Sequence, residues 1–179
     1  MQNFDKINIE HDGDSETSLS IEVSNKKVKP ATIIKFASLA ICILFFFPLF
    51  TVSCSDYTIS FTGFDATFGK AVSVLGSSER VDGNFASIFL LIIPLAIFLA
   101  FQLKKIQQAL QGKIFYTAAG LSVAGIAAMN IFKGAVRERA QSEMLHPEFT
   151  ATFNIMIFLY IIVVAIAAAS AYLLKKNRH

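Results

Sequence analysis

Four long runs of apolar residues constrain this 179-residue chain more than any other feature of its sequence. They lie in residues 31–52, 84–103, 114–133 and 153–174, and the second run contains no charged residue. A helix needs about 20 predominantly apolar residues to cross the hydrocarbon core of a bilayer, and each run meets that length. We therefore predict an all-α membrane protein, a four-transmembrane-helix bundle, rather than a soluble globule.

The composition offers few residues that could form a catalytic, cofactor or metal site. Charged residues make up only 16% of the chain, against about 25% in an ordinary soluble domain. The two cysteines are too few for a disulfide framework or a four-cysteine zinc site, and the histidines at positions 11, 146 and 179 are far apart in the sequence. No set of nucleophile, base and acid is visible either. We expect no catalytic, cofactor or metal site, and no enzyme.

Lysine and arginine predict the topology, because these residues are enriched in the cytoplasmic segments beside membrane spans. On the side of the two termini there are ten, at positions 26, 27, 29, 35, 104, 105, 113, 175, 176 and 178. The opposite side has five, at positions 70, 80, 133, 137 and 139. Both termini are therefore expected in the cytoplasm. Since the basic residues lie next to the membrane, the bilayer is the expected partner, and nucleic acid is not.

The two ends of the chain lie outside the predicted membrane domain, residues 31–174. Residues 1–30 are first acidic and then basic, which is typical of a disordered cytoplasmic tail, and residues 175–179 form a short basic end. Within the tail, residues 18–24 alternate between polar and apolar. This alternation also fits a short strand that pairs with a partner.

The first outer loop, residues 53–83, has a strand signature. Tyr57, Ile59 and Phe61 alternate with polar residues, and Gly63 ends the alternation. A strand has unpaired edges and needs a partner, and residues 51–55 are the only obvious candidate within the chain. Otherwise the strand would pair with a second copy of the chain or with another protein.

The same loop continues with a helical pattern. Phe64, Phe68, Val72 and Leu75 have the spacing of one helix face, so we expect an amphipathic helix on the outer membrane surface or over the end of the bundle. The loop is the leading candidate for an interaction surface, and the alternative is that it only packs over the helix ends. The candidate interaction residues are Tyr57, Ile59, Phe61, Gly63, Phe64, Asp65 and Phe68.

Small residues at four-residue spacing predict close packing of the third and fourth helices. Such stripes let helix backbones approach each other, within one chain or between copies. Asn130 and Asn154 lie toward the outer side of these two helices, where they could hydrogen-bond to each other or line a pore. The stripes that we single out are Gly120, Ala124 and Ala128 in the third helix, and two in the fourth, Ala165 with Ala169 and Ala167 with Ala171.

One segment, residues 45–69, resembles a group of small bacterial four-span membrane proteins of no established activity. In that group a span ending in Pro-Phe is followed by Val-Ser-Cys, a short strand, and a Ser/Thr-Gly-hydrophobe-acid segment that ends in glycine. Some members carry an N-terminal zinc ribbon, for which this chain has no cysteines. The resemblance implies a bacterial inner-membrane protein and transfers no functional residue. The matching positions are Pro48, Phe50, Val52, Ser53, Cys54, Thr62, Gly63, Phe64, Asp65 and Gly69.

These observations favour a non-enzymatic membrane protein that acts as a structural or interaction subunit of a membrane assembly. An oligomeric pore or small-solute transport protein is the alternative. No carboxylate lies within any predicted span, which disfavours ion-coupled transport, because intramembrane carboxylates commonly carry the coupled proton.

Overall fold

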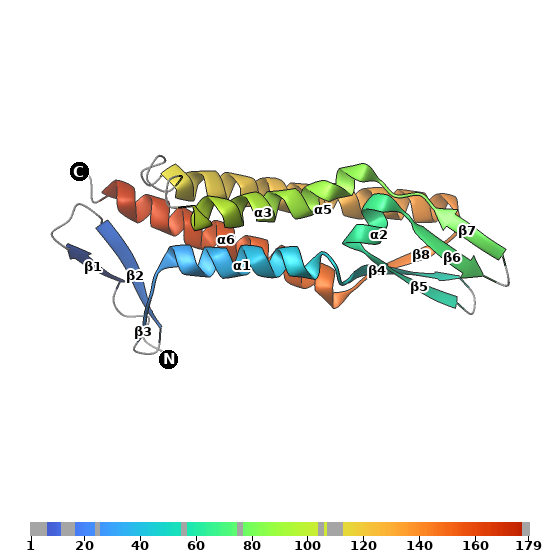
Figure 1. Cartoon of the computed structure of the whole chain (residues 1–179), viewed down its shortest axis with the longest axis horizontal. Helices are drawn as coiled ribbons and strands as arrows, with labels where there is room; N and C mark the ends of the chain where they lie inside the picture. The colour runs from blue at the N-terminus through green and yellow to red at the C-terminus, as the bar shows by residue number, and fades with distance from the viewer. Residues whose placement is uncertain are drawn as a thin grey trace.

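The computed structural model describes residues 7–11, 17–23, 26–54, 57–74, 77–103, 106 and 113–176. Its helices lie side by side in an elongated bundle, with strands at both ends (Figure 1). The strands of the N-terminal segment lie at the same end as the C-terminus of the last helix, and the strands of the first outer loop lie at the opposite end.

Four helices form the bundle: α1 (Pro30–Leu44), α3 (Phe89–Gln102), α5 (Lys113–Ser142) and α6 (Ala151–Lys176). A short 3-10 helix, η1 (Phe85–Ile88), leads into α3. Each helix packs against two neighbours, in the cyclic order α1, α3, α5, α6. Neighbours in this order run antiparallel (Figure 1), which closes a square bundle around an apolar interior.

Three of these segments are long and apolar enough to span a membrane, namely residues 85–102, 113–142 and 151–176. The prediction of a transmembrane protein is thus supported. The first helix is shorter: its 15 residues extend about 22 Å, against about 30 Å of bilayer core. The helix lengths alone therefore support three spans, and α1 is too short to be counted as a fourth.

The first predicted span, residues 31–52, is wrong in its second half. The helix ends at Leu44, and residues 48–54 form a strand instead. Pro48 has no backbone N–H and cannot continue a helix. The residues after it obtain their backbone hydrogen bonds from strands on both sides.

The buried core consists of two clusters stacked along the bundle. The cluster at the end of the first outer loop is dominated by aromatic residues, including Phe45, Phe132 and Phe153. The cluster at the other end consists of aliphatic residues such as Ile34 together with Phe101. Three hydroxyls are buried in the helices where the clusters meet. Among the described residues Ser38, Ser122 and Tyr160 have no hydrogen-bond partner for these groups.

Tyr160 fits into the bundle because Gly125 faces it from α5. A Cβ atom on Gly125 would lie 2.5 Å from Cε1 of the tyrosine ring. Carbon atoms pack at about 3.5–4.0 Å, so only glycine leaves room for the ring at this position.

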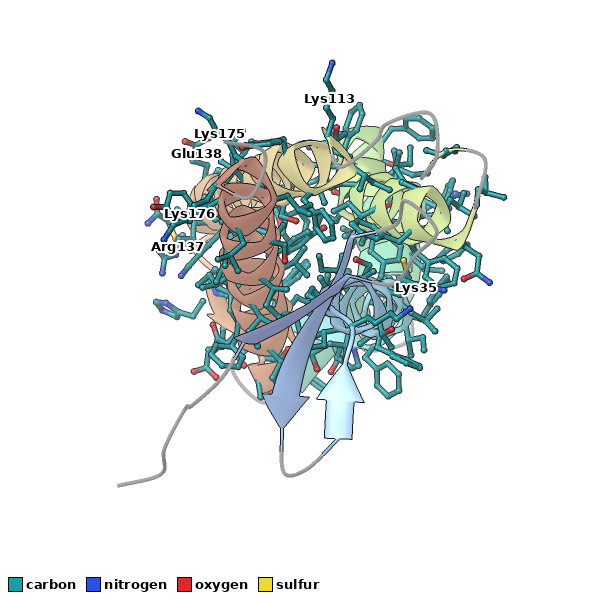
Figure 2. All side chains as sticks on the ribbon, turned by 90° about the vertical axis from the view of Figure 1, so that its left-hand side faces the viewer. Lys35, Lys113, Arg137, Glu138, Lys175 and Lys176 are labelled. Atoms are coloured by element: carbon teal, nitrogen blue, oxygen red, sulfur yellow. The ribbon has the colours of Figure 1, made fainter. Side chains whose placement is uncertain are left out.

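The end of the bundle near the termini is basic. Figure 2 shows Lys35, Lys113, Lys175 and Lys176 projecting outward from the helices at this end. The sequence favoured a disordered N-terminal tail, with a short strand in residues 18–24 as the alternative. The described part of this segment has three strands instead. They pair antiparallel in the order β1 (Ile7–His11), β2 (Thr17–Val23) and β3 (Lys26–Val28).

The opposite end carries a small folded unit, which we call the cap domain. It consists of residues 48–54, 57–74 and 77–84, the part of α5 beyond Phe132 and residues 143–150. A three-stranded antiparallel sheet has the order β5-β4-β8, and β6 and β7 form a separate hairpin. The cap elements are β4 (Pro48–Cys54), β5 (Tyr57–Thr62), α2 (Gly63–Phe68), β6 (Lys70–Val74), β7 (Ser77–Val81) and β8 (His146–Phe149).

Candidate binding site

The sheet of the cap domain is built around its central strand, β4. Its residues Thr51–Cys54 pair with Tyr57–Ser60 of β5, so the intrachain partner that the sequence suggested for this strand is confirmed. On the other side β4 pairs with β8, which the sequence did not indicate. Phe50 of β4 lies opposite Phe61 of β5, and the two rings stack with centroids 5.1 Å apart. This stack gives the sheet an apolar face toward the bundle.

Helix α2 follows β5 directly and begins with a complete capping box. The Asp65 N–H donates to Thr62 Oγ1 at 3.1 Å, and the Thr62 N–H donates to Asp65 Oδ2 at 2.9 Å. The helix ends at Phe68, because Gly69 has a φ of 84° and turns the chain out of the helix. The predicted amphipathic helix is therefore wrong beyond Phe68: residues 70–74 are a strand, which suits the β-branched Val72.

Gly63 fixes the cap domain on the end of α1. Its N–H donates to the Phe45 carbonyl oxygen at 2.9 Å, and a Cβ atom there would overlap the Phe45 ring. Of the two positions that the sequence left open for α2, the structure thus has the helix over the end of the bundle.

An apolar cavity of about 200 Å³ lies between the sheet, α2 and the C-terminal part of α5. The rings of Phe50, Phe61 and Phe132 line it, and Phe132 meets Phe50 edge-on at 5.8 Å. The other apolar lining residues are Val52, Ile59, Ala66, Val81, Ala135, Val136, Ala140 and Leu145.

A few polar groups complete the lining of this cavity. Ser87, in the first turn of η1, is only 4% exposed, and its hydroxyl has no partner among the described residues. Charged residues line another part: Arg139 Nη1 donates to the Asp82 carbonyl oxygen at 3.0 Å, and Arg139 Nε lies 3.8 Å from Glu143 Oε1. Apolar walls with a few placed polar groups are typical of small-molecule sites.

Asp65 also lines the cavity, but the structure gives it a structural role. Besides capping α2, its carboxylate lies 3.6 Å from Lys70 Nζ. The same ammonium donates to the Ser60 carbonyl oxygen at 2.7 Å. Lysines on edge strands reduce the pairing of that edge with other chains. This contact leaves β5 less suited to pairing with a partner's strand than its sequence pattern indicated.

The other predicted interaction residues divide into two groups. Ile59 and Phe61 line the cavity, whereas Tyr57, Phe64 and Phe68 are exposed. Phe64 and Phe68 have ring centroids 4.7 Å apart, and Phe68 meets Phe85 edge-on at 6.3 Å. We call Phe64, Phe68 and Phe85 the aromatic row.

The predicted helix-packing residues mostly face away from the bundle interior. Helices α5 and α6 do pack together, but Gly120, Ala124, Ala165 and Ala169 are exposed, and Ala128 is half-buried. The buried positions of α5 are instead Ala118, Ser122, Gly125 and Met129. In α6 the second predicted stripe, Ala167 and Ala171, is buried.

Asn130 and Asn154 do not form the predicted pair. Both are exposed, and Asn130 Nδ2 donates to the Ile126 carbonyl oxygen of its own helix at 3.0 Å. This bond satisfies one amide donor within α5.

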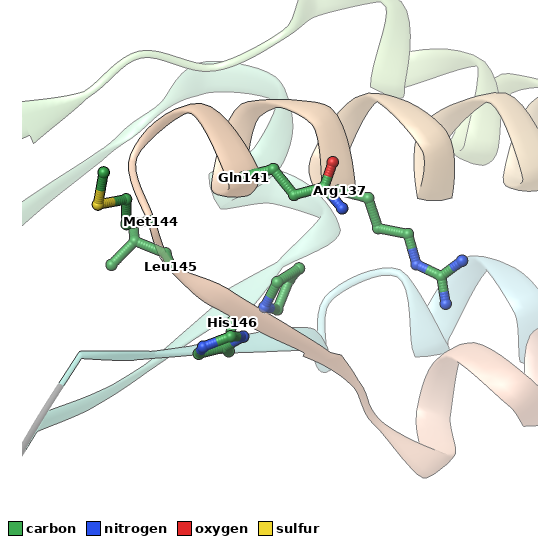
Figure 3. Close-up of a pocket in the computed structure, with 6 residues that line it drawn as sticks. Arg137, Gln141, Met144, Leu145 and His146 are labelled. Atoms are coloured by element: carbon green, nitrogen blue, oxygen red, sulfur yellow. The ribbon is translucent and has the colours of Figure 1, made fainter.

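A second hollow lies where α5 connects to β8 (Figure 3). It has a volume of about 370 Å³ and is lined by Arg137, Gln141, Met144, Leu145, His146 and Pro147. Most of these side chains are exposed, and Met144 is 91% exposed. Because the lining of this hollow is as polar as it is apolar, whereas the apolar cavity is lined mainly by apolar surface, the apolar cavity is the stronger candidate site.

Sequence reasoning missed several residues of this cavity, above all Ser87 and Arg139. Each lies in or beside a predicted span, and neither belongs to a recognisable motif. Comparison of the chain with protein-family models, curated proteins and solved structures found no match. The resemblance to four-span bacterial proteins therefore stays a prediction.

Proposed function

We propose that this chain is a non-enzymatic subunit of a membrane assembly, and that its cap domain is the contact surface for a protein partner or a second copy. In this proposal α1 and residues 45–47 together complete a fourth crossing. Both termini are then cytoplasmic and the cap domain lies outside, in a bacterial inner membrane. The basic end of the bundle near the termini supports this orientation.

The aromatic row carries the proposal. Phe64, Phe68 and Phe85 are 50%, 45% and 68% exposed, and they form a continuous surface. Aromatic side chains are enriched in protein interfaces, and contiguous exposed apolar surface marks contact sites with proteins or lipids. Tyr57, at the start of β5, adds a further exposed aromatic residue on the cap domain.

Affinity purification with mass spectrometry tests this function on the full-length chain in mild detergent. The double variant Phe64→Ala/Phe68→Ala removes most of the aromatic row. Phe158→Ala/Tyr172→Ala is the matched control, since these α6 residues are 62% and 65% exposed but lie outside the cap domain. We expect a defined partner, or a second copy, to be lost only from the cap variant. A monomer without partner for all three proteins contradicts the proposal.

An oligomeric pore remains the alternative function, because Asn130 and Asn154 are exposed on the outside of the bundle. The interior of a single bundle is filled: Met129, Met156 and Tyr160 have no exposed surface. A water path would therefore need to lie between copies of the chain. Ion flux in proteoliposomes tests this alternative, and flux that Asn130→Leu abolishes would favour it over the subunit role.

A further inference from the structure

We propose that the apolar cavity of the cap domain binds a small neutral molecule with an apolar body and one hydrogen-bonding group, such as a phenol or an alcohol. This binding does not depend on the proposed function. The cavity and the aromatic row share no residue, so their roles can be separated by substitution.

The size of the cavity fits a single ring with a substituent. An apolar cavity of about 150 Å³ in a protein core binds benzene and stays free of water. The cavity here holds about 200 Å³ and, unlike such a core cavity, is partly open to solvent and has polar residues in its lining, with Phe50, Phe61 and Phe132 as its aromatic walls. It thus has room for a ring and a few further heavy atoms.

Ser87 gives the cavity its polar specificity. The Ser87 N–H donates to the Asn84 carbonyl oxygen at 2.9 Å, so its backbone donor is satisfied within η1. Its hydroxyl oxygen, however, has less than 1 Å² of accessible surface and no partner among the described residues, so it would turn toward the cavity to meet a ligand. A buried hydroxyl without a partner is costly, and a ligand oxygen would supply the missing bond.

The charged residues restrict the ligand further. Arg139 already binds the Asp82 carbonyl oxygen and lies near Glu143, so no cation in the lining is left uncompensated to hold an anion. Asp65 and Asp82 also line the cavity, and their carboxylates would repel an anion. The rest of the wall is mainly apolar and would disfavour any ion. These groups therefore favour a neutral ligand.

Ligand-observed ¹⁹F NMR on the full chain in lipid nanodiscs tests the proposal. The probes are 4-(trifluoromethyl)phenol and (trifluoromethyl)benzene, which differ by the hydroxyl alone. We expect saturable binding of both, with the phenol about fivefold tighter, the ratio of one ordinary hydrogen bond. Empty nanodiscs correct for partition into lipid.

Two variants and one control complete the design. Ser87→Ala should remove the preference for the phenol and leave the benzene analogue unchanged. Ala135→Phe should fill the cavity and abolish saturable binding of both probes. Ala124→Phe is the matched control, because it adds the same ring to the exposed face of the same helix.

Non-saturable partition of both probes into wild-type nanodiscs would overturn the proposal. A phenol preference that persists in Ser87→Ala would overturn the role of the hydroxyl. If Ala135→Phe does not fold, as circular dichroism would show, Ser87→Ala still decides, since it adds no volume.

Discussion

The contact between Gly125 and Tyr160 gives the sharpest test of how the helices pack. In Gly125→Ala the new methyl group would lie 2.5 Å and 2.6 Å from two ring carbons and 3.0 Å from the hydroxyl oxygen of Tyr160. Because carbon contacts relax at about 3.5–4.0 Å, the ring would have to move by about 1 Å. Overpacking of this kind costs about 1–3 kcal/mol.

Gly120→Ala is the matched control in the same helix. No atom lies within 4 Å of a Cβ built on Gly120, so this variant avoids the steric cost. Both variants gain about 0.5–1 kcal/mol from replacing a helical glycine. The gain cancels in the comparison, so Gly125→Ala should be less stable than Gly120→Ala by about 1–3 kcal/mol.

Unfolding in mixed detergent micelles, followed by circular dichroism, measures this difference directly. Equal stability of the two variants would refute the packing that places Tyr160 against α5. Lower stability of Gly120→Ala would favour instead the sequence-based prediction that Gly120 lies in a helix contact.

Three further substitutions test other parts of the fold. Tyr160→Phe removes a buried hydroxyl without a described partner, so stability in the same assay should stay unchanged or rise by up to about 1–3 kcal/mol; a loss of stability would contradict a hydroxyl without a partner. Thr62→Ala breaks the capping box and should cost about 0.5–2 kcal/mol, seen as faster hydrogen exchange in α2; unchanged exchange would contradict the cap. Gly69→Ala forces a φ of 84° and a ψ of 164° on an alanine and should lower the melting temperature at a cost of about 1–3 kcal/mol, and an unchanged melting temperature would contradict this backbone geometry.

The membrane class of the fold could be predicted from hydropathy, but the first span could not be bounded. Residues 45–52 are apolar in any conformation, and a short apolar run fits a buried strand as well as a helix. Residues 48–54 form a strand because β4 pairs with a partner strand on each of its sides. The partner β8 comes from almost 100 residues further along the chain, beyond the reach of local patterns.

The sequence also could not show which face of each helix points into the bundle. A transmembrane helix is apolar on all sides, so the stripe of Gly120, Ala124 and Ala128 looked equivalent to the buried positions Ser122 and Gly125. Ala124 and Gly125 are adjacent in the sequence, yet Ala124 is exposed and Gly125 is buried.

The cavity shows a similar division. Ile59 and Phe61, which stand out in the alternation of β5, line the cavity, and so does Asp65 from the segment that follows. Ser87, Phe132 and Arg139 join them only through the tertiary fold, since they come from η1 and α5. A local pattern cannot indicate such a combination.

Photo-crosslinking in intact cells tests the central claim, that the cap domain is the contact surface, most directly. A photoreactive phenylalanine analogue replaces Phe64 in the aromatic row, and a second protein carries it at Phe158 on α6 as the control. We predict a discrete crosslinked protein, or a crosslinked second copy, from position 64 only. The same adducts from both positions, or none from position 64, would contradict the claim.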